Sequence, residues 1–372
     1  MRGVTVSNNT SNLLFDDAFL CDLNLICLGN KKLEEILYNS YNSKKGKLVF
    51  CDKENEYVSE RIPGKTRSII NKHKMIHKGK DYLDSVDVYI YEAGKSTKNI
   101  LHTDAHEIFH VFSAIIPTII EGNNNSYISN NSIYYNSMGS IGMYNNRGVH
   151  NYGIMFKETL TDILARLSLT RFNNEFDNTI SSNDILKKSD SDYDSYGANS
   201  GYTAFTYLTK LAIAAFSNDK DADFDNMINN EKNIFFGRKK APNNEKIFKN
   251  DLLYGYLANP LHIKEKWEEI NGINSYDEFC SEIDNTFSTY LNTGIIDCNN
   301  LYLHMAKITE YMNKRIDHYL NIGRLSFEEA LSITNNYNKV WKEVNDEYNK
   351  LEKNYKSNIF NRLKTSKTRE YV

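Results

Sequence analysis

Five consecutive residues, His106-Glu107-Ile108-Phe109-His110, constrain this chain more than any other stretch. They lie in a run of helix-forming and apolar residues, and on a helix two residues four positions apart share one face. The imidazoles of His106 and His110 can therefore reach the same ion, with Glu107 beside it as a candidate general base. The sequence thus predicts a helix that carries part of a metal site.

The residues on either side of this run predict its structural setting. Apolar and polar residues alternate over 85–91, with Val88 and Ile90 on one face, which predicts a half-buried strand. The metal-binding helix is expected to begin near Thr97 and to stop at Pro117, because proline cannot continue a helix. A strand that leads into the motif helix is the local context this kind of site requires.

The rest of the chain predicts short strands first and helices later. A strand is expected over 47–51 with a partner at 57–62, and the basic segment 65–80 is interpreted as a helix with a solvated face. Residues 121–150 form a long polar loop, which contains a hairpin that continues to 152. Helical periodicity predicts further helices over 154–169, 201–216, 244–258, 261–270, 275–293, 299–322 and 326–358.

These elements predict an α+β fold that is predominantly helical. We expect an N-terminal α/β segment over 1–84, a catalytic core over 85–217 with a small mixed sheet above the metal-binding helix, and a C-terminal helical region over 218–372. The boundary near 218 is placed by polar stretches that follow the helix at 201–216.

Charge and cysteine usage exclude several classes of function. The formal net charge is -3, so no basic field points to a nucleic-acid partner. The 5 cysteines form no Cys-x-x-Cys pair, which favours reduced thiols in a reducing compartment. The N-terminus has no apolar signal segment, and no stretch is long and apolar enough for an integral membrane segment. We expect a cytoplasmic protein, or one exported without a recognisable signal peptide.

A third metal ligand is expected on the helix that follows the polar loop. Glu158 and Asp162 lie four residues apart on one face of an otherwise apolar helix. Buried carboxylates are costly without a partner, so this pair needs an explanation. Glu158 as a metal ligand and Asp162 as an acceptor for a ligating histidine N–H supply one. The alternative is an ordinary amphipathic helix, with His106 and His110 half-buried and Glu107 solvated.

The residues from His106 to His110, followed by Glu158-Thr159-Leu160-Thr161-Asp162, resemble the zinc metallopeptidases called gluzincins. The pattern is also similar to zincin-like proteins of AT-rich Gram-positive bacteria, although Lys157 stands where those have Asn. The resemblance spans roughly residues 85–217.

The resemblance implies a zincin-like core with one zinc ion per chain, held by His106, His110 and Glu158. It also implies a peptide or protein substrate, with Glu107 as the general base that activates a zinc-bound water. A further group must stabilise the negative charge on the substrate carbonyl oxygen. The candidates for this role are His150, Tyr152 and Tyr202, and the sequence does not choose among them.

Two further residues lie near the motif on the same predicted helix. His102 lies four residues before His106, and we interpret it as a surface residue rather than one that lines the site. For Asp104, a helix cap or a solvent contact is favoured over a role at the metal.

The leading hypothesis is a zinc-dependent metallopeptidase with an edge strand that binds an extended peptide. One alternative is a secreted or injected toxin or effector with the same chemistry. Another is a catalytically inactive zincin-like protein whose C-terminal helices bind a partner. The oligomeric state stays open.

Overall fold

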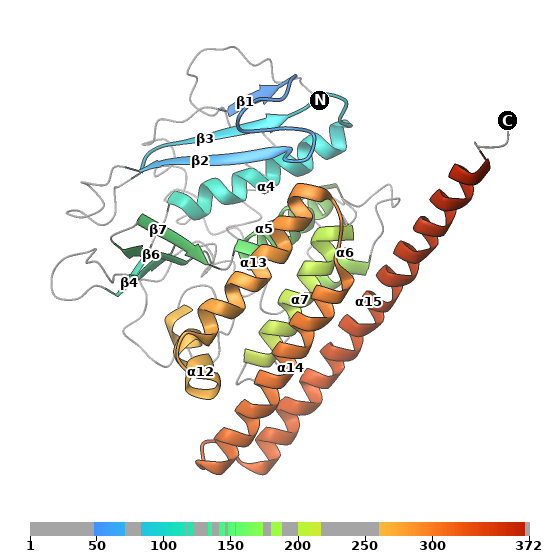
Figure 1. Cartoon of the computed structure of the whole chain (residues 1–372). Coiled ribbons are helices and arrows are strands. Elements are labelled where there is room, and N and C mark those ends of the chain that lie inside the picture. The colour runs from blue at the N-terminus through green and yellow to red at the C-terminus, as the bar shows by residue number, and fades with distance from the viewer. Residues whose placement is uncertain are drawn as a thin grey trace.

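The computed structural model describes residues 48–70, 83–115, 118–121, 133–135, 141–145, 148–152, 154–173, 180–187, 200–216 and 260–368. Within this part the chain is mostly helical and has two small sheets (Figure 1). The predicted α+β class, dominated by helices, is therefore confirmed. The helix expected over 244–258 lies outside the described residues. None of the helices in the described part has the length and apolar composition needed to cross a membrane.

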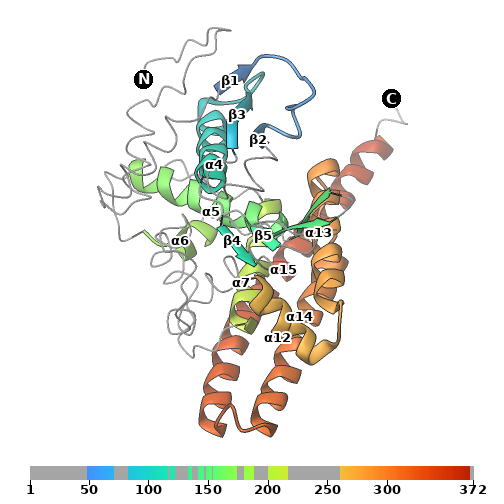
Figure 2. The same cartoon turned by 90° about the vertical axis from the view of Figure 1, so that its left-hand side faces the viewer.

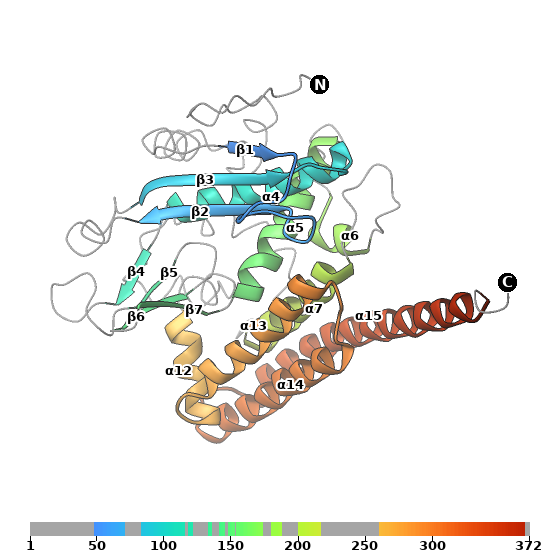
Figure 3. The ribbon, with the colours of Figure 1, turned by 45° about the horizontal axis from the view of Figure 1, so that its top comes forward.

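The first sheet is mixed and has three strands in the order β1-β3-β2. β1 (Leu48–Cys51) pairs in parallel with β3 (Leu83–Tyr91), and β2 (Gly64–Ile70) pairs antiparallel with the other side of β3. Figure 3 shows the three strands side by side above α4 (Thr97–Ile115), the helix that carries the histidine motif. The predicted small mixed sheet is present, and β2 forms its edge on one side.

Two sequence predictions for this sheet are wrong. Residues 64–70 form β2, whereas the basic charges of 65–80 had indicated a helix. The strand at 47–51 pairs with β3 and not with residues 57–62, which form no strand. The charges do form a separate face, but it is the face of a strand, since Lys65 and Arg67 alternate with the residues that face α4.

A tight turn joins β3 to α4. Gly94 sits in this turn with φ of 69°, in the left-handed region that favours glycine. The chain therefore reverses, and α4 runs back beneath β3 in the same direction as β2. As a result, the N-terminal ends of β2 and α4 lie at the same end of the site.

The second sheet lies in the segment that was expected to be a loop. Its four antiparallel strands follow the chain order, and the last two form the predicted hairpin, in which Asn145 pairs with Gly148. The first two strands were not predicted. The strands are β4 (Thr118–Glu121), β5 (Ile133–Tyr135), β6 (Ile141–Asn145) and β7 (Gly148–Tyr152).

α5 (Ile154–Asn173) is the central helix of the fold. It packs against α4 on one side and against α6 (Ser182–Lys187), α7 (Ser200–Phe216) and α13 (Ser275–Thr293) on others. Apolar residues all around α5 are buried, as expected for a helix that is covered on nearly every side. Any charged side chain on α5 therefore needs a partner inside the protein.

Within residues 260–368 the chain forms four helices that complete the core: α12 (Pro260–Asn271), α13 (Ser275–Thr293), α14 (Cys298–Asn321) and α15 (Phe327–Thr368). α14 begins after Asp297, whose side chain accepts hydrogen bonds from the backbone N–H groups of Asn299 and Asn300. Figure 2 shows α14 and α15 as a long antiparallel hairpin, and both pack against α7.

Candidate metal centre

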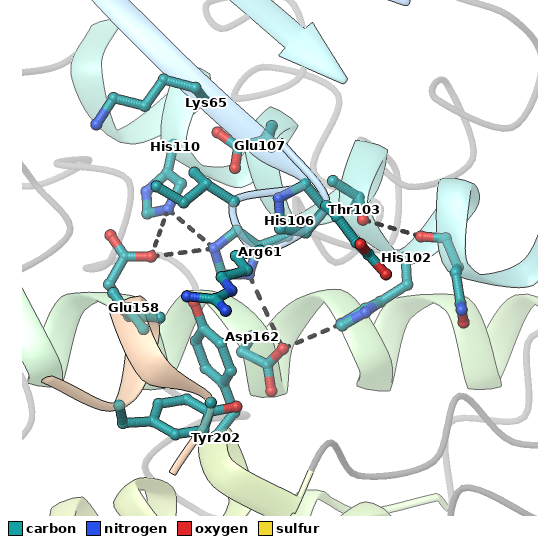
Figure 4. Close-up of a pocket in the computed structure, with 18 of the residues that line it drawn as sticks. Arg61, Lys65, His102, Thr103, His106, Glu107, His110, Glu158, Asp162 and Tyr202 are labelled. Carbon is teal, nitrogen blue, oxygen red and sulfur yellow. Dashed lines mark hydrogen bonds and ion pairs between the residues drawn. The ribbon is translucent and has the colours of Figure 1, made fainter. Parts of the chain in front are cut away.

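Two helices face each other across the site, and each presents a stripe of polar residues at four-residue spacing. α4 contributes a row of three histidines, and α5 contributes Glu158, then Asp162 and then Arg166. Figure 4 shows the three histidines facing Glu158 and Asp162 between the helices, with Glu158 opposite His110. The α5 stripe explains how a buried helix tolerates charged residues, because each of them has a partner on this face.

The three predicted ligands come together as a nearly regular triangle. His106 Nε2 lies 3.1 Å from His110 Nε2, and Glu158 Oε2 lies 3.2 Å from each of them. Zinc bonds of about 2.0–2.2 Å in a tetrahedral arrangement place neighbouring ligand atoms roughly 3.3 Å apart. The donor set and its spacing therefore fit a zinc ion. Among the described residues this is the one group of His, Cys, Asp and Glu side chains that converges in this way.

Hydrogen bonds alone do not satisfy these three contacts. A neutral imidazole nitrogen either donates or accepts, and an ionised carboxylate oxygen only accepts. Each of the three atoms touches the other two, and each is either a donor or an acceptor. At least two of them therefore have the same role, and the contact between those two is not a hydrogen bond. A cation that takes up three lone pairs removes this conflict, which is the strongest indication in the structure that the triangle is a metal site.

Electrostatics keep Glu158 in the charge state that a metal ligand needs. Burial by itself would raise the pKa of Glu158, but the neighbouring His110 and His106 hold it well below its usual range. Burial would lower the pKa of His106, yet the hydrogen bond and charge of Glu158 raise it overall. Glu158 is therefore an ionised carboxylate in this environment, and its negative charge favours a positive charge next to it.

Asp162 lies behind the candidate ligands, next to two further residues. Its Oδ1 lies 3.0 Å from His102 Nε2, and its Oδ2 pairs with Arg166, whose side chain is fully buried. His106 Nδ1 is 4.0 Å from Asp162 Oδ1, which is longer than a hydrogen bond, so Asp162 acts on His106 through its charge. Although burial would raise the pKa of Asp162, Arg166 and His102 lower it far more.

One interpretation made from the sequence is wrong at this point, and another is wrong in part. His102 is not simply a surface residue, because its Nε2 lies 3.0 Å from Asp162 Oδ1 and it lines the cleft. Of the two roles expected for Asp104, the helix cap is excluded, because α4 begins seven residues earlier, at Thr97. Arg166 was missed altogether, although its place four residues after Asp162 on a buried helix was a usable signal.

Glu107 packs against the edge strand β2 and is hydrogen-bonded to it. Its side chain is 5% exposed, and its Oε2 accepts a hydrogen bond of 2.6 Å from the hydroxyl of Thr66 on β2. Gly64 leaves room for the carboxylate, since a Cβ there would lie 2.5 Å from Glu107 Oε1. Sequence reasoning missed Thr66 and Gly64 because it assigned this segment to a helix.

Of the three candidates for stabilising the carbonyl oxygen, the structure describes the side chain of one. Tyr202 on α7 lines the cleft, and its ring meets that of His106 edge to face at 5.9 Å. Burial raises the pKa of Tyr202 well above its usual value, and the charges of Glu158 and Asp162 add to this, so its hydroxyl keeps its proton. His150 and Tyr152 lie on β7, but their side chains are outside the described part of the structure.

The ligand triangle opens into a cleft of about 860 Å³. One wall is the edge strand β2 with the loop before it, the floor is α4, and the opposite wall is the C-terminal end of α13. Arg61 crosses from the first wall to the second, where it donates a 2.8 Å hydrogen bond to the carbonyl of Asn292. A cleft of this size holds several residues of a peptide.

Comparisons of the chain with protein-family models, with curated proteins and with solved structures find no match. The function is therefore argued from the geometry of the cleft and its side chains.

Proposed function

We propose that this protein is a zinc-dependent metallopeptidase. The observation that carries the proposal is the triangle of His106, His110 and Glu158, which meets in an open cleft with Glu107 at its side. Three protein ligands and an open position are typical of catalytic zinc, whereas structural zinc has four protein ligands. The cleft supplies room for a substrate at the open position.

The roles of the residues follow from their contacts. A bound zinc ion supplies Lewis acidity, which polarises a carbonyl group and acidifies water. Glu107 accepts the proton of the attacking water and passes it to the departing amine, while Thr66 fixes the orientation of its carboxylate. Tyr202 has a protonated hydroxyl in the cleft and is the described candidate for a donor to the carbonyl oxygen.

The edge strand offers a binding surface for an extended peptide. The backbone N–H of Tyr91 donates to Pro63, so in the antiparallel register Lys65 and Arg67 are the β2 residues that bond to β3. The backbone groups of Gly64 and Thr66 then point away from β3, toward the cleft. A peptide that adds a strand here passes directly over the ligands.

A second candidate function is partner binding by the C-terminal helices. Large apolar side chains are exposed near the tip of the α14–α15 hairpin, where Phe327 is 72% and Leu331 51% exposed. Exposed apolar groups in one place indicate an interaction surface. This role is compatible with the peptidase proposal, because the tip does not line the cleft.

The experiment that tests the peptidase proposal is digestion of a mixed peptide library by the zinc-loaded protein. We expect cleavage by the natural chain and a decrease of roughly 100- to 10,000-fold in Glu107→Gln, because a positioned general base contributes about that much. Glu328→Gln, an exposed change on α15, is the matched control and should cleave normally. Equal cleavage by Glu107→Gln would exclude the general-base role, and no cleavage by the natural chain would exclude the peptidase.

A further inference from the structure

One end of the cleft carries an excess of positive charge. Arg61, Lys95 and Lys98 line it, and they are here called the basic end. Arg61 donates to the carbonyl of Asn292, and Lys95 donates to the carbonyl of Glu60 at 3.2 Å. Within the described residues these two cations are therefore bonded to neutral groups and form no ion pair. Glu60 is the one acidic side chain among the cleft residues at this end.

The acidic groups at the metal centre do not neutralise the basic end. Glu158 faces the two histidines, and Asp162 is paired with Arg166. Glu107 keeps its charge, because its partner Thr66 is uncharged, but it lies beside the triangle and not at the basic end. The first turn of α4 also holds no acidic residue. A positive field therefore persists along this part of the cleft, where partial burial strengthens it.

The distance from the ligands to the basic end is set by α4. Lys98 precedes His106 by eight residues, which corresponds to about 12 Å along a helix that rises 1.5 Å per residue. An extended peptide covers this distance in about three to four residues, at roughly 3.3 Å each. The basic end therefore lies opposite a substrate residue three or four positions from the bond that is cleaved.

The direction of the bound peptide follows from β2. Antiparallel pairing is the more stable arrangement, so a peptide on this edge would run opposite to β2. β2 runs in the same direction as α4, because Gly64 lies against Thr103 and Glu107 while Thr66, further along β2, bonds to Glu107. Residues before Gly64 therefore lie toward the N-terminal end of α4. The substrate residues after the cleaved bond therefore run toward Arg61 and the two lysines.

We propose that the basic end selects substrates with a carboxylate about three or four residues C-terminal to the cleaved bond. This carboxylate belongs to an Asp or Glu side chain or to the C-terminus of the peptide. Arg61 has five N–H donors and uses one of them on Asn292, so it can still bind a carboxylate in a forked geometry. This inference rests on the proposed peptidase function, but its test measures the binding of peptides as well as their cleavage.

The test uses fluorescein-labelled peptides of Ala, Thr and Val with zinc-loaded Glu107→Gln, which should bind substrate without cleaving it. Four peptides are compared: one with two Asp in its C-terminal half, one with two Asp in its N-terminal half, a neutral amidated one and a neutral one with a free carboxyl terminus. The basic end is removed by Arg61→Gln with Lys95→Gln and Lys98→Gln. Its matched control loses three exposed cations of α15, by Lys339→Gln with Lys342→Gln and Lys353→Gln.

We expect the peptide with C-terminal Asp to bind about tenfold more tightly than the neutral amidated one, as partly screened charge pairs would give. The preference should shrink when the ionic strength rises from about 0.05 M to about 0.5 M. It should vanish in the basic-end variant and persist in the α15 control. The neutral peptide with a free terminus shows whether a terminal carboxylate substitutes for Asp.

Several outcomes would overturn the inference. These are equal binding of all four peptides, a preference for Asp in the N-terminal half, or a preference that survives loss of the basic end. The same peptides are then offered to the natural chain with zinc. Selective binding without any cleavage would support the basic end as a carboxylate site and reject the peptidase proposal. Cleavage without a preference for acidic peptides would support the peptidase proposal and reject the basic end.

Discussion

At the scale of single residues, the site depends on side chains that touch the ligands without belonging to them. Thr66 and Arg166 are the clearest cases. One holds the carboxylate of Glu107, and the other balances the buried charge of Asp162. Neither belongs to the motif, so a search for His-Glu-x-x-His alone does not find them.

Thr66→Val should decrease kcat by about tenfold to a hundredfold, because a base that loses its fixed orientation is misplaced relative to the proton it takes. The zinc content and KM should stay near those of the natural chain, since Thr66 contacts neither the ligands nor the peptide side chains. Thr66→Ser keeps the hydroxyl and should restore most of kcat. Steady-state kinetics on one library-derived peptide make the measurement, and a Ser variant as poor as Val would argue for a purely structural role.

Arg166→Met should lower the free energy of unfolding by about 3–5 kcal/mol, because it leaves the buried charge of Asp162 without its main partner. The double change Asp162→Asn with Arg166→Met removes both charges and should recover a large part of this loss. Urea unfolding of the metal-free proteins measures both values. If the double variant were no more stable than the single one, the buried pair would not be the cause.

At the scale of elements, long helices were predictable from the sequence and the sheets only in part. The apolar pattern of 154–169 and the stop at Pro117 located α5 and the end of α4 to within a few residues. β2 was not predictable in the same way, because its basic residues suit either a strand or a helix. Pairing with β3, which decides the matter, is a contact between distant segments.

The candidate site followed the same division. The three candidate ligands and Glu107 could be picked out from the sequence because helical spacing fixes which residues share a face. The residues that contact this group from outside the motif lie on β2 or on the facing helix, as Thr66 does for Glu107. Only the folded chain brings such distant segments together. The sequence left Tyr202 as one of three candidates for the stabilising group, and only the folded chain places it on α7 beside His106.

The packing of α13 against α14 contains a buried histidine that should make stability depend on pH. His304 is 4% exposed and contacts Thr286 Oγ1 at 2.8 Å, with Glu282 and Lys307 nearby. Burial lowers the pKa of His304 to about 4, from an ordinary value of 6.5. The unfolded chain therefore takes up this proton at a higher pH than the folded chain does.

The sign of the effect follows from proton linkage. Between pH 6.5 and about 4 the unfolded state binds more protons at His304, so the stability of the fold decreases as the pH falls through this window. His304→Gln should show a weaker decrease over the same window, as measured by urea unfolding at several pH values. Parallel curves for the variant and the natural chain would contradict the assignment.

At the scale of the whole molecule, the cleft lies between two parts that share one core. Buried apolar residues run without a break from Val88 in the first sheet to Tyr348 in α15. The ion pair of Lys210 with Glu343, at 2.8 Å, ties α15 to α7, the helix that carries Tyr202. The C-terminal helices thus support the wall of the site, and Arg61 with Asn292 joins the two walls at the mouth.

The central claim is that His106, His110 and Glu158 bind one zinc ion, and metal analysis of the purified chain tests it most directly. After dialysis against zinc and removal of free metal, the natural chain should retain about one zinc ion, as expected for a site with three protein ligands. Glu158→Ala should retain far less, while Glu60→Ala, which changes a carboxylate in the same cleft away from the triangle, should retain as much as the natural chain. A natural chain that binds no zinc, or a Glu158→Ala variant that binds it equally well, would contradict the account.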